Sequence, residues 1–169
     1  VFVSSLISSS EEQNVKVDCH WIETFDERPG KIWLRNTPTY EKYYKKSGKA
    51  QEYYKQAKEA SPDKRQDLLK NGFGALRTSY ESLVIFDLFK GVVQRFNERV
   101  SIDSLSDVIV SKEIRDEIID GFHKCSRYME GHSHSDKYSY KKPDLASLRE
   151  EIQRFDGIKK KIKDFRKDK

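Results

Sequence analysis

The second half of the chain carries hydrophobic residues three and four positions apart, which is the spacing of helices with one buried face. From Gly74 to Val100 this pattern predicts a central, buried helix of about 25 residues. Ser111 and Asp144 are residue types that cap helix N-termini, and each precedes a further hydrophobic stripe. We therefore expect a mainly α fold.

The first 36 residues favour β-structure instead. Residues 1–6 form a hydrophobic run, residues 15–21 alternate between hydrophobic and polar positions, and Ile32–Leu34 follows a turn-forming cluster. Three short strands are too few to form a core of their own. Because the sequence also begins with valine rather than methionine, we expect these strands to belong to a sheet of a longer protein, with this chain as its C-terminal part.

A connector rich in tyrosine and lysine occupies residues 37–72, before a helical domain that we expect over residues 73–169. Basic residues among aromatic ones can bind single-stranded nucleic acid by pairing with phosphates and stacking on bases. The same composition suits polar helices whose tyrosines pack on a neighbouring element. Ser61-Pro62-Asp63 is a helix-start signal in this segment. Both interpretations are open for the connector's tyrosines: Tyr40, Tyr43, Tyr44, Tyr53 and Tyr54.

Composition excludes several classes of protein. Hydrophobic and charged residues each make up 36% of the 169 residues, and no uncharged stretch is long enough to cross a bilayer. The two cysteines, Cys19 and Cys125, form no disulfide framework, which favours a reducing, cytoplasmic compartment without membrane contact. The sequence has no phosphate-binding GxxxxGK[ST] loop, so we expect no cofactor in this chain.

The positive charge is concentrated at the C-terminus. The net charge is +5, and residues 141–169 alone contain 11 Lys and Arg against 6 Asp and Glu. A basic face of this kind attracts phosphates, although a solubilising, amphipathic terminal helix has the same composition. If the face binds RNA, four clustered lysines are the candidates: Lys159, Lys160, Lys161 and Lys163.

Three of the four histidines, His123, His132 and His134, lie within twelve residues, the last two in a polar stretch that predicts a loop. With the nearby Cys125 they could supply metal ligands, although their spacing fits no structural zinc pattern. Alternatively, His132 and His134 indicate acid–base catalysis. Arg127 lies five residues before His132, and an arginine beside a histidine can stabilise the charge that develops on a phosphate. A chance pairing in a polar loop is the third interpretation.

Arg77 and Glu81 are the second unusual feature. They lie four residues apart and therefore share one face of the predicted helix. On a helical wheel this face is otherwise hydrophobic, with Val84 and Leu88 close to the pair. Charges in such a place are unfavourable unless they form an ion pair or take part in binding or catalysis. The pair is therefore either a structural salt bridge or part of an active site between this helix and the histidine loop.

These residues resemble a known family. Arg77-Thr-Ser-Tyr-Glu81 on a long helix, followed by a helix and a histidine-bearing loop, is similar to the bacterial anticodon nucleases of the PrrC and RloC type. Their C-terminal nuclease domains belong to the HEPN group of all-α ribonucleases, whose catalytic set in this family is an Arg, a Glu four residues later and a downstream His. Arg127 and His132 also resemble the RxxxxH pattern of HEPN ribonucleases. The interval of 51 positions from Glu81 to His132 is longer than expected for anticodon nucleases, so it is open which histidine is catalytic and whether the site is active.

The resemblance implies an HEPN-like helical bundle preceded by a short β-rich remnant of an ATPase lobe of the ABC or SMC-like type. It places ATP and Mg²⁺ in the ATPase region before Val1. It also implies a role in antiviral defence by cleavage of RNA, with the anticodon loop of a tRNA as the target. A homodimer would form through the ATPase and the helical domain.

We therefore expect metal-independent RNA cleavage in which the 2′-hydroxyl of the substrate is the nucleophile. His132 or His134 would transfer protons. Arg77 and Arg127 would stabilise the transition state, and Glu81 would orient Arg77 or share in proton transfer. The alternative is a non-catalytic C-terminal lobe of the same class of ATPase, which mediates dimerisation or partner docking. In that case Arg77 and Glu81 form only a core salt bridge.

Overall fold

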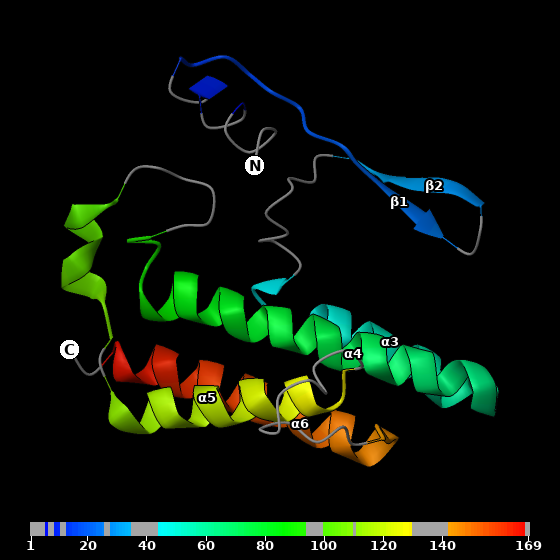
Figure 1. The fold of residues 1–169 in the computed structure, drawn as a ribbon. Coiled ribbons are helices and arrows are strands. Elements are labelled where there is room, and N and C mark those ends of the chain that lie inside the picture. The colour runs from blue at the N-terminus through cyan, green and yellow to red at the C-terminus, as the bar shows by residue number, and fades with distance from the viewer. Residues whose placement is uncertain are drawn as a thin grey trace.

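The computed structural model of the chain describes residues 6, 9–10, 13–25, 28–34, 44–93, 100–109, 111–129 and 142–167. Helices dominate this part of the chain, which confirms the mainly α expectation (Figure 1). In chain order, the elements are the strands β1 (Trp21–Phe25) and β2 (Arg28–Trp33), the helices α3 (Gly48–Glu59) and α4 (Pro62–Ser82), the π-helix η1 (Leu83–Leu88), the 3₁₀-helix η2 (Ile102–Asp107), and the helices α5 (Lys112–Arg127) and α6 (Leu145–Phe165).

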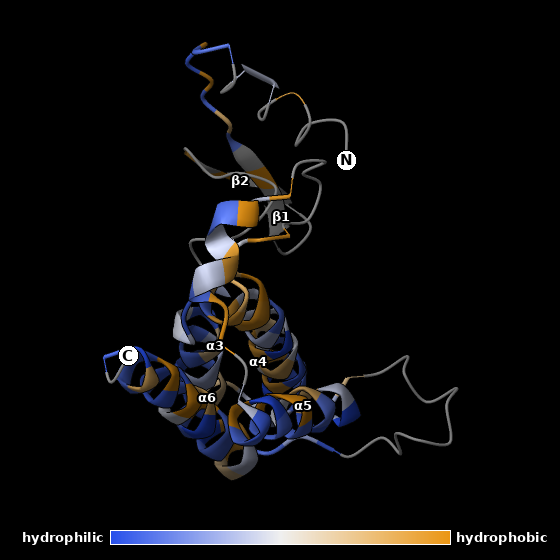
Figure 2. Ribbon diagram, turned by 90° about the vertical axis from the view of Figure 1, so that its left-hand side faces the viewer, coloured by the Kyte–Doolittle hydropathy of each residue, from blue (hydrophilic) through white to orange (hydrophobic). Residues whose placement is uncertain are grey.

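Four helices, α3 to α6, surround one hydrophobic core. Figure 2 shows them grouped together, with hydrophobic stretches turned toward the middle of the bundle. Within the described residues, none of the helices combines the length and the apolar character needed to span a bilayer. The largest fully buried apolar or aromatic side chains come from α4, α6 and the end of α5, and include Phe73, Leu76, Tyr80, Tyr128, Leu148 and Phe155.

The β-structure of the described residues is one antiparallel hairpin, β1–β2, in which Trp21 lies opposite Trp33. Neither strand contacts a helix among the described elements. The strand predicted over residues 15–21 is wrong in its position, because β1 begins only at Trp21. Val15 and Val17 are about half exposed, and no strand of the described residues pairs with this segment, so alternation alone does not make it a strand. Residues 1–5 of the first predicted strand lie outside the described residues, and its last residue, Leu6, is helical rather than extended, so the strand prediction is wrong at that residue.

Helix α4 runs through the boundary that the sequence suggested between residues 72 and 73. It begins at Pro62 after Ser61, as the start signal predicted, and continues without a break to Ser82. Gly72 lies inside the helix and does not interrupt it. Its role is to allow α6 to come close to α4. A Cβ at this position would lie 2.6 Å from the Leu148 side chain. The glycine therefore serves packing between helices rather than separation of two units.

The long helix predicted from Gly74 to Val100 is wrong at both ends. It starts earlier, at Pro62, and its helical course ends with the π-helix at Leu88. Lys90 and Gly91 then take φ values of 52° and 69°, in the left-handed region that ends helices. Val100 is exposed and lies outside any helix.

The caps predicted for the last two helices are confirmed. The Ser111 hydroxyl accepts a hydrogen bond from the Ile114 amide at 3.4 Å, and the Asp144 carboxylate accepts one from the Ser147 amide at 2.8 Å. The described tyrosines of the connector, Tyr44, Tyr53 and Tyr54, are partly buried and pack against the core. For these three residues the structure therefore favours the packing interpretation, while Tyr40 and Tyr43 lie outside the described residues.

Candidate functional site

Arg77 and Glu81 form an ion pair on the side of α4 that faces α5. Their closest atoms, Nη2 and Oε1, are 3.8 Å apart, and the side chains keep 29% and 24% of their exposure. The Arg77 guanidinium also lies 4.8 Å from the centre of the Phe122 ring of α5, a cation–π distance. The pair is thus not a fully buried core salt bridge, because both charges still reach the surface.

Arg77 has an unsatisfied donor beside this pair. Its Nε atom is buried and has no hydrogen-bond partner among the described residues. Buried donors are satisfied in most proteins, and exceptions often mark a place where a ligand or an ion completes the bonding. The observation singles out the guanidinium as a candidate anion-binding group.

A pocket of about 330 Å³ opens next to Glu81, between α4 and η1 on one side and α5 on the other. Its walls are mainly hydrophobic, and Glu81 and His123 supply a carboxylate and an imidazole among them. The lining residues are Tyr80, Glu81, Val84, Ile85, Ile118, Ile119, Phe122 and His123. A carboxylate and an imidazole therefore border the same small space, and the guanidinium of Arg77 lies against the Phe122 ring that lines it.

His123 is the residue that sequence reasoning missed for catalysis, since it was grouped only with possible metal ligands. Its position could have been found from the pattern of the helix. His123 follows Ile119 by four residues and therefore shares a face with it. That face turns toward Glu81, which lies on a different helix and is distant in sequence.

The other predicted catalytic residues are placed only in part. Arg127 is exposed at the last residue of α5, one helical turn after His123. His132 and His134 lie outside the described residues.

Among the residues that the structure does describe, no group of three or more His, Cys, Asp or Glu could hold a metal ion. Cys125 is fully buried, and burial raises the pKa of its thiol well above the ordinary value, which makes it a poor metal ligand.

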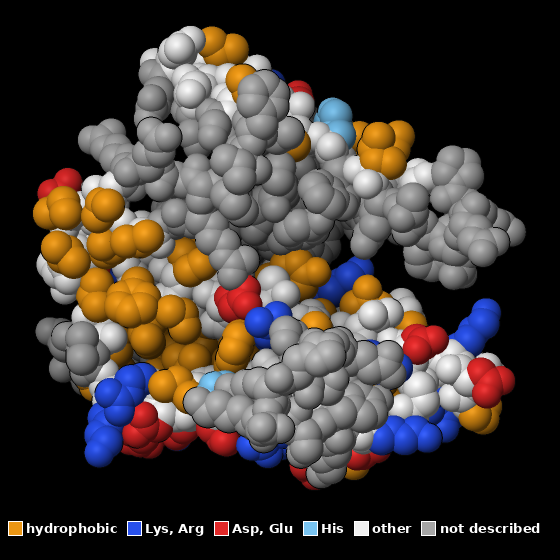
Figure 3. Space-filling model, viewed as in Figure 1, with side chains coloured by type: hydrophobic (Ala, Val, Ile, Leu, Met, Phe, Trp, Pro, Cys, Tyr) orange, Lys and Arg blue, Asp and Glu red, His pale blue; other side chains and the backbone are white. Residues whose placement is uncertain are grey.

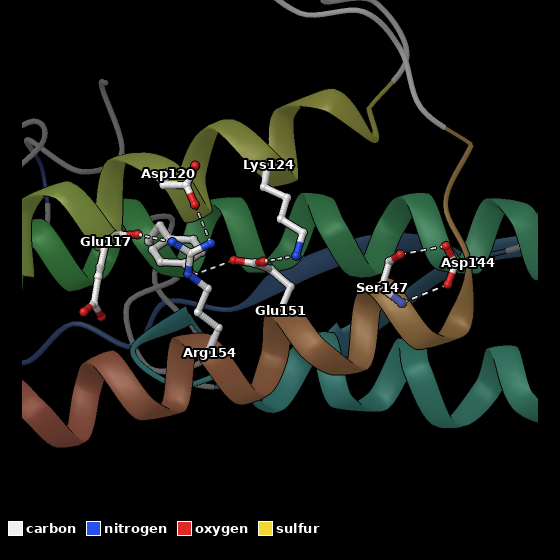
Figure 4. Close-up of polar contacts among 8 residues, drawn as sticks. Glu117, Asp120, Lys124, Asp144, Ser147, Glu151 and Arg154 are labelled. Atoms are coloured by element: carbon white, nitrogen blue, oxygen red, sulfur yellow. Dashed lines mark hydrogen bonds and ion pairs between the residues drawn. The ribbon is translucent and has the colours of Figure 1, made fainter.

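A buried carboxylate of α6 contacts Tyr80, one of the residues that line the pocket. Glu151 has no exposed surface, and the Tyr80 hydroxyl donates a 2.8 Å hydrogen bond to its Oε1. Lys124 Nζ lies 3.0 Å from its other oxygen, Oε2. Figure 4 shows Glu151 pointing from α6 toward Lys124 of α5. Burial lowers the pKa of Lys124, but the hydrogen bond and the charge of Glu151 outweigh it and raise that pKa.

Arg154 adds a second connection between α6 and α5. Its guanidinium lies 2.6 Å from an Asp120 oxygen and donates to the Glu117 carbonyl at 3.3 Å (Figure 4). The network therefore joins α4, α5 and α6 at one level of the bundle. Tyr80 precedes Glu81 in sequence, and Lys124 follows His123. The two residues that contact Glu151 are therefore the sequence neighbours of Glu81 and His123.

The four lysines predicted to bind RNA lie on α6 and differ in their surroundings. Lys159 is 2.8 Å from Asp87 of η1 and also donates to the Lys45 carbonyl. Lys161 lies 2.5 Å from Glu117, and this hydrogen bond raises its pKa. Lys160 and Lys163 are exposed. The cluster is therefore not a uniform basic face, because two of its members already pair with carboxylates.

Comparisons with protein-family models, with curated proteins and with solved structures found no match to this chain. The candidate site therefore depends on its own geometry, in which a glutamate and a histidine from two helices line one pocket and an arginine contacts the Phe122 ring that also lines it.

Proposed function

We propose that the chain is a metal-independent endoribonuclease whose active site includes Arg77, Glu81 and His123. One observation carries the proposal: Glu81 and His123 line the same pocket, and the Arg77 guanidinium lies against its Phe122 wall. Acid–base groups and a fixed cation are the parts that cleavage of RNA by its own 2′-hydroxyl requires. The resemblance to anticodon nucleases supports the same reaction, with tRNA as substrate and a preceding ATPase as its control.

In this reaction the 2′-oxygen attacks the neighbouring phosphorus, and the bond from phosphorus to the 5′-oxygen breaks. His123 accepts the proton of the 2′-hydroxyl or donates one to the leaving 5′-oxygen, since histidine transfers protons near neutral pH. Arg77 stabilises the charge on the phosphorane-like transition state, and Glu81 orients Arg77. The products are a 2′,3′-cyclic phosphate and a 5′-hydroxyl. Arg127, His132 and His134 remain candidates for further roles in phosphate binding and proton transfer.

The test is cleavage of RNA by single variants. Arg77→Ala, Glu81→Gln and His123→Gln should each lower the rate by roughly two to four decades, as loss of acid–base or electrostatic groups does. His20→Gln is the matched control, because His20 does not line the pocket. Excess EDTA should leave cleavage unchanged. Equal rates in all three variants and in wild type would refute the proposal.

A second candidate function, partner docking without catalysis, is favoured by an exposed hydrophobic surface. Figure 3 shows hydrophobic side chains gathered over η2 and the end of η1. Ile102, Leu105, Phe89 and Val93 are each between 45% and 64% exposed. Surfaces of this kind mark protein interfaces more often than catalytic sites. If this function is the correct one, Ile102→Lys should change the oligomeric state or abolish partner binding, while Arg77→Ala should change neither.

A further inference from the structure

We infer that one end of the helical bundle binds the phosphate backbone of RNA through four exposed lysines that the fold gathers from three segments of the chain. The inference rests on the proposed ribonuclease function and adds the surface that holds the substrate. The basic helix expected from the sequence does not include this surface, because two of its lysines lie outside α6. We call it the basic end, and it consists of Lys46 before α3, Lys90 after η1, and Lys160 and Lys163 on α6.

Contacts around Asp87 hold the three segments together. Lys159 of α6 lies 2.8 Å from the Asp87 carboxylate of η1 and also donates to the carbonyl of Lys45. Arg166, directly after α6, donates to the Asp87 carbonyl. Figure 2 shows α3 and α6 next to each other on one side of the bundle. The start of α3, the end of η1 and the last turns of α6 therefore meet at this end.

The lysines of the basic end differ from the other two lysines of α6. Lys159 and Lys161 pair with Asp87 and Glu117, so their charges are already compensated. Lys163 follows Lys159 by four residues and therefore lies on the same flank of α6, the one that faces η1. Within the part of the chain that the structure describes, no ion pair involves a lysine of the basic end, and all four are exposed. A ligand can contact them without breaking an existing pair.

The local charge favours a polyanion. Residues 45–46, 87–90 and 156–167 together contain nine Lys and Arg against three Asp and no Glu, whereas the whole chain contains 33 basic against 28 acidic residues. Such an excess attracts a polymer whose regularly spaced phosphates can contact several lysines at once. Phe89, next to Lys90, is 45% exposed, so an unpaired base can stack beside the lysines. Because contacts to phosphates do not identify the base, we expect binding without sequence preference.

The basic end adjoins the candidate site across η1. Val84 and Ile85 of this π-helix line the pocket together with Glu81. Asp87 of the same π-helix contacts Lys159 of α6. The six positions from Glu81 to Asp87 correspond to about 9 Å along a helix. An RNA chain held by the lysines therefore has only a short distance to cover to the pocket.

The salt dependence of binding tests the inference on the full chain. The probe is a labelled single-stranded RNA with 2′-O-methyl groups, which keeps the phosphates but cannot be cleaved through its 2′-hydroxyls. The fourfold variant, Lys46→Gln, Lys90→Gln, Lys160→Gln and Lys163→Gln together, should lower the log–log slope of affinity against salt by about two to three. An unchanged slope would overturn the inference.

A matched variant at the opposite end of the bundle controls for net charge. There the Gln66 side chain of α4 donates a 3.4 Å hydrogen bond to the Pro143 carbonyl, which places the start of α4 beside the start of α6. Removing the same charge at this end should leave the slope within about one of wild type. An equal loss in both variants would mean that only net charge acts, and would overturn the inference. The control variant combines changes at four exposed positions: Lys58→Gln, Lys64→Gln, Lys142→Gln and Arg149→Gln.

Two double variants test whether the surface is composite. Lys46→Gln with Lys90→Gln, and Lys160→Gln with Lys163→Gln, should each lower the slope by about one to two. They also replace the fourfold variant if circular dichroism shows that it does not fold. A loss confined to the pair on α6 would overturn the composite surface and leave only a basic helix.

Cleavage of unmodified RNA separates this inference from the proposed function. If both are correct, the fourfold variant should raise KM roughly tenfold or more and leave kcat near wild type, because the lysines hold the substrate away from the reacting atoms. Wild-type kinetics in the fourfold variant would refute the basic end and leave the ribonuclease. The expected change of slope in a chain that cleaves no RNA would refute the ribonuclease and leave an RNA-binding surface. Binding to phosphatidylserine vesicles but not to RNA would overturn the inference in favour of a membrane.

Discussion

Glu151 joins three helices through one buried carboxylate. Tyr80 of α4 and Lys124 of α5 contact its two oxygens, at 2.8 Å and 3.0 Å, and its own helix is α6. Removing one partner from a buried charged group is unfavourable by several kcal/mol in general, because the remaining charge loses its compensation. The carboxylate thus fixes how far α4 and α5 can slide past each other, and with them Glu81 and His123.

Gly121 is the residue that allows this contact, and it gives the first prediction. A Cβ at Gly121 would lie 2.2 Å from the Tyr80 hydroxyl and 2.9 Å from Glu151 Oε1. We expect Gly121→Ala to lower the free energy of unfolding by about 2 kcal/mol or more, as overpacking next to a buried network does. Gly157→Ala is the control, because nothing lies within 4 Å of its added Cβ. It should raise stability by about 0.5–1 kcal/mol, since alanine favours helix more than glycine does. Urea unfolding measures both, and equal effects would contradict the prediction.

The pKa of Tyr80 allows us to predict how the free energy of unfolding changes at alkaline pH. Burial, followed by the charge and hydrogen bond of Glu151, raises the pKa of Tyr80 far above its ordinary value. Above about pH 10 the unfolded chain therefore binds fewer protons than the folded one, and stability falls by up to about 1.4 kcal/mol per pH unit. The raised pKa of Lys124 acts in the same direction. The contribution of Tyr80 and Lys124 to the free energy of unfolding is fully present below the ordinary pKa values of tyrosine and lysine. It is lost as the pH rises above them.

Urea unfolding between pH 8 and 11 measures this slope. Tyr80→Phe should be less stable at pH 8 by about 1.5–3 kcal/mol, the contribution of a hydrogen bond to a charged group, and should show a flatter decline with pH. Tyr54→Phe on α3 is the control, because it removes a hydroxyl that does not contact Glu151. A decline as steep in Tyr80→Phe as in wild type would show that Tyr80 is not responsible.

At the scale of single residues, sequence reasoning identified what depends on local spacing and missed what depends on helix packing. Arg77 and Glu81 are neighbours because of their four-residue interval, and the structure has them paired. Glu151 follows Leu148 by three residues and precedes Phe155 by four, so the stripe of α6 indicates its burial, which we did not predict. Its partners are not indicated by the sequence, because Tyr80 and Lys124 reach it only after three helices have packed.

At the scale of elements, η1 and α6 are connected by the ion pair of Asp87 and Lys159. Both side chains are largely buried, with 26% and 31% of their exposure left, and Lys159 also donates to the Lys45 carbonyl. The pair lies near the end of the π-helix that continues α4, shortly before the chain turns at Gly91. The pair therefore stabilises the end of the long helix against α6.

This arrangement divides the basic cluster into structural and exposed lysines. Lys159→Glu should destabilise the fold by about 2 kcal/mol, because it removes a charged hydrogen bond and places a second carboxylate beside Asp87. Lys160→Glu should leave stability within about 0.5 kcal/mol of wild type, since its side chain is exposed. If α6 binds RNA, Lys160→Glu together with Lys163→Glu should lower the salt dependence of binding by about one to two in log–log slope. An unchanged slope would mean that these lysines are only solvated.

Element positions were predictable where a cap or a turn residue fixed them. Ser61-Pro62, Ser111 and Asp144 each begin a helix as predicted. The end of the long helix was predicted too late, because hydrophobic residues continue beyond Leu88 while the backbone turns at Lys90 and Gly91. A hydrophobic stripe indicates a buried face but does not specify where the backbone leaves the helix.

At the scale of the whole molecule, the helical bundle and the hairpin are separate in their contacts. Core residues extend from Ala50 to Ile162 and form one cluster, whereas β1 and β2 contact only each other among the described elements. Ala57 and Leu69 are buried in that cluster although they belong to the segment predicted to be a connector. The core therefore needs α3 and all of α4, and it extends beyond the predicted domain of residues 73–169.

Two truncated chains test this division. A chain of residues 37–169 should unfold cooperatively, with a midpoint within about 4 °C of the full chain, because the removed residues 1–36 include a hairpin that buries nothing on a helix. A chain of residues 73–169 should show no cooperative thermal transition. It lacks α3 and the first half of α4, which supply Ala50, Ala57 and Leu69 to the buried core and Gly72 to the contact with Leu148. Calorimetry and circular dichroism measure both. A large loss of stability on removing residues 1–36 would show that the hairpin belongs to the same folding unit, and a cooperative transition for 73–169 would restore the boundary inside α4.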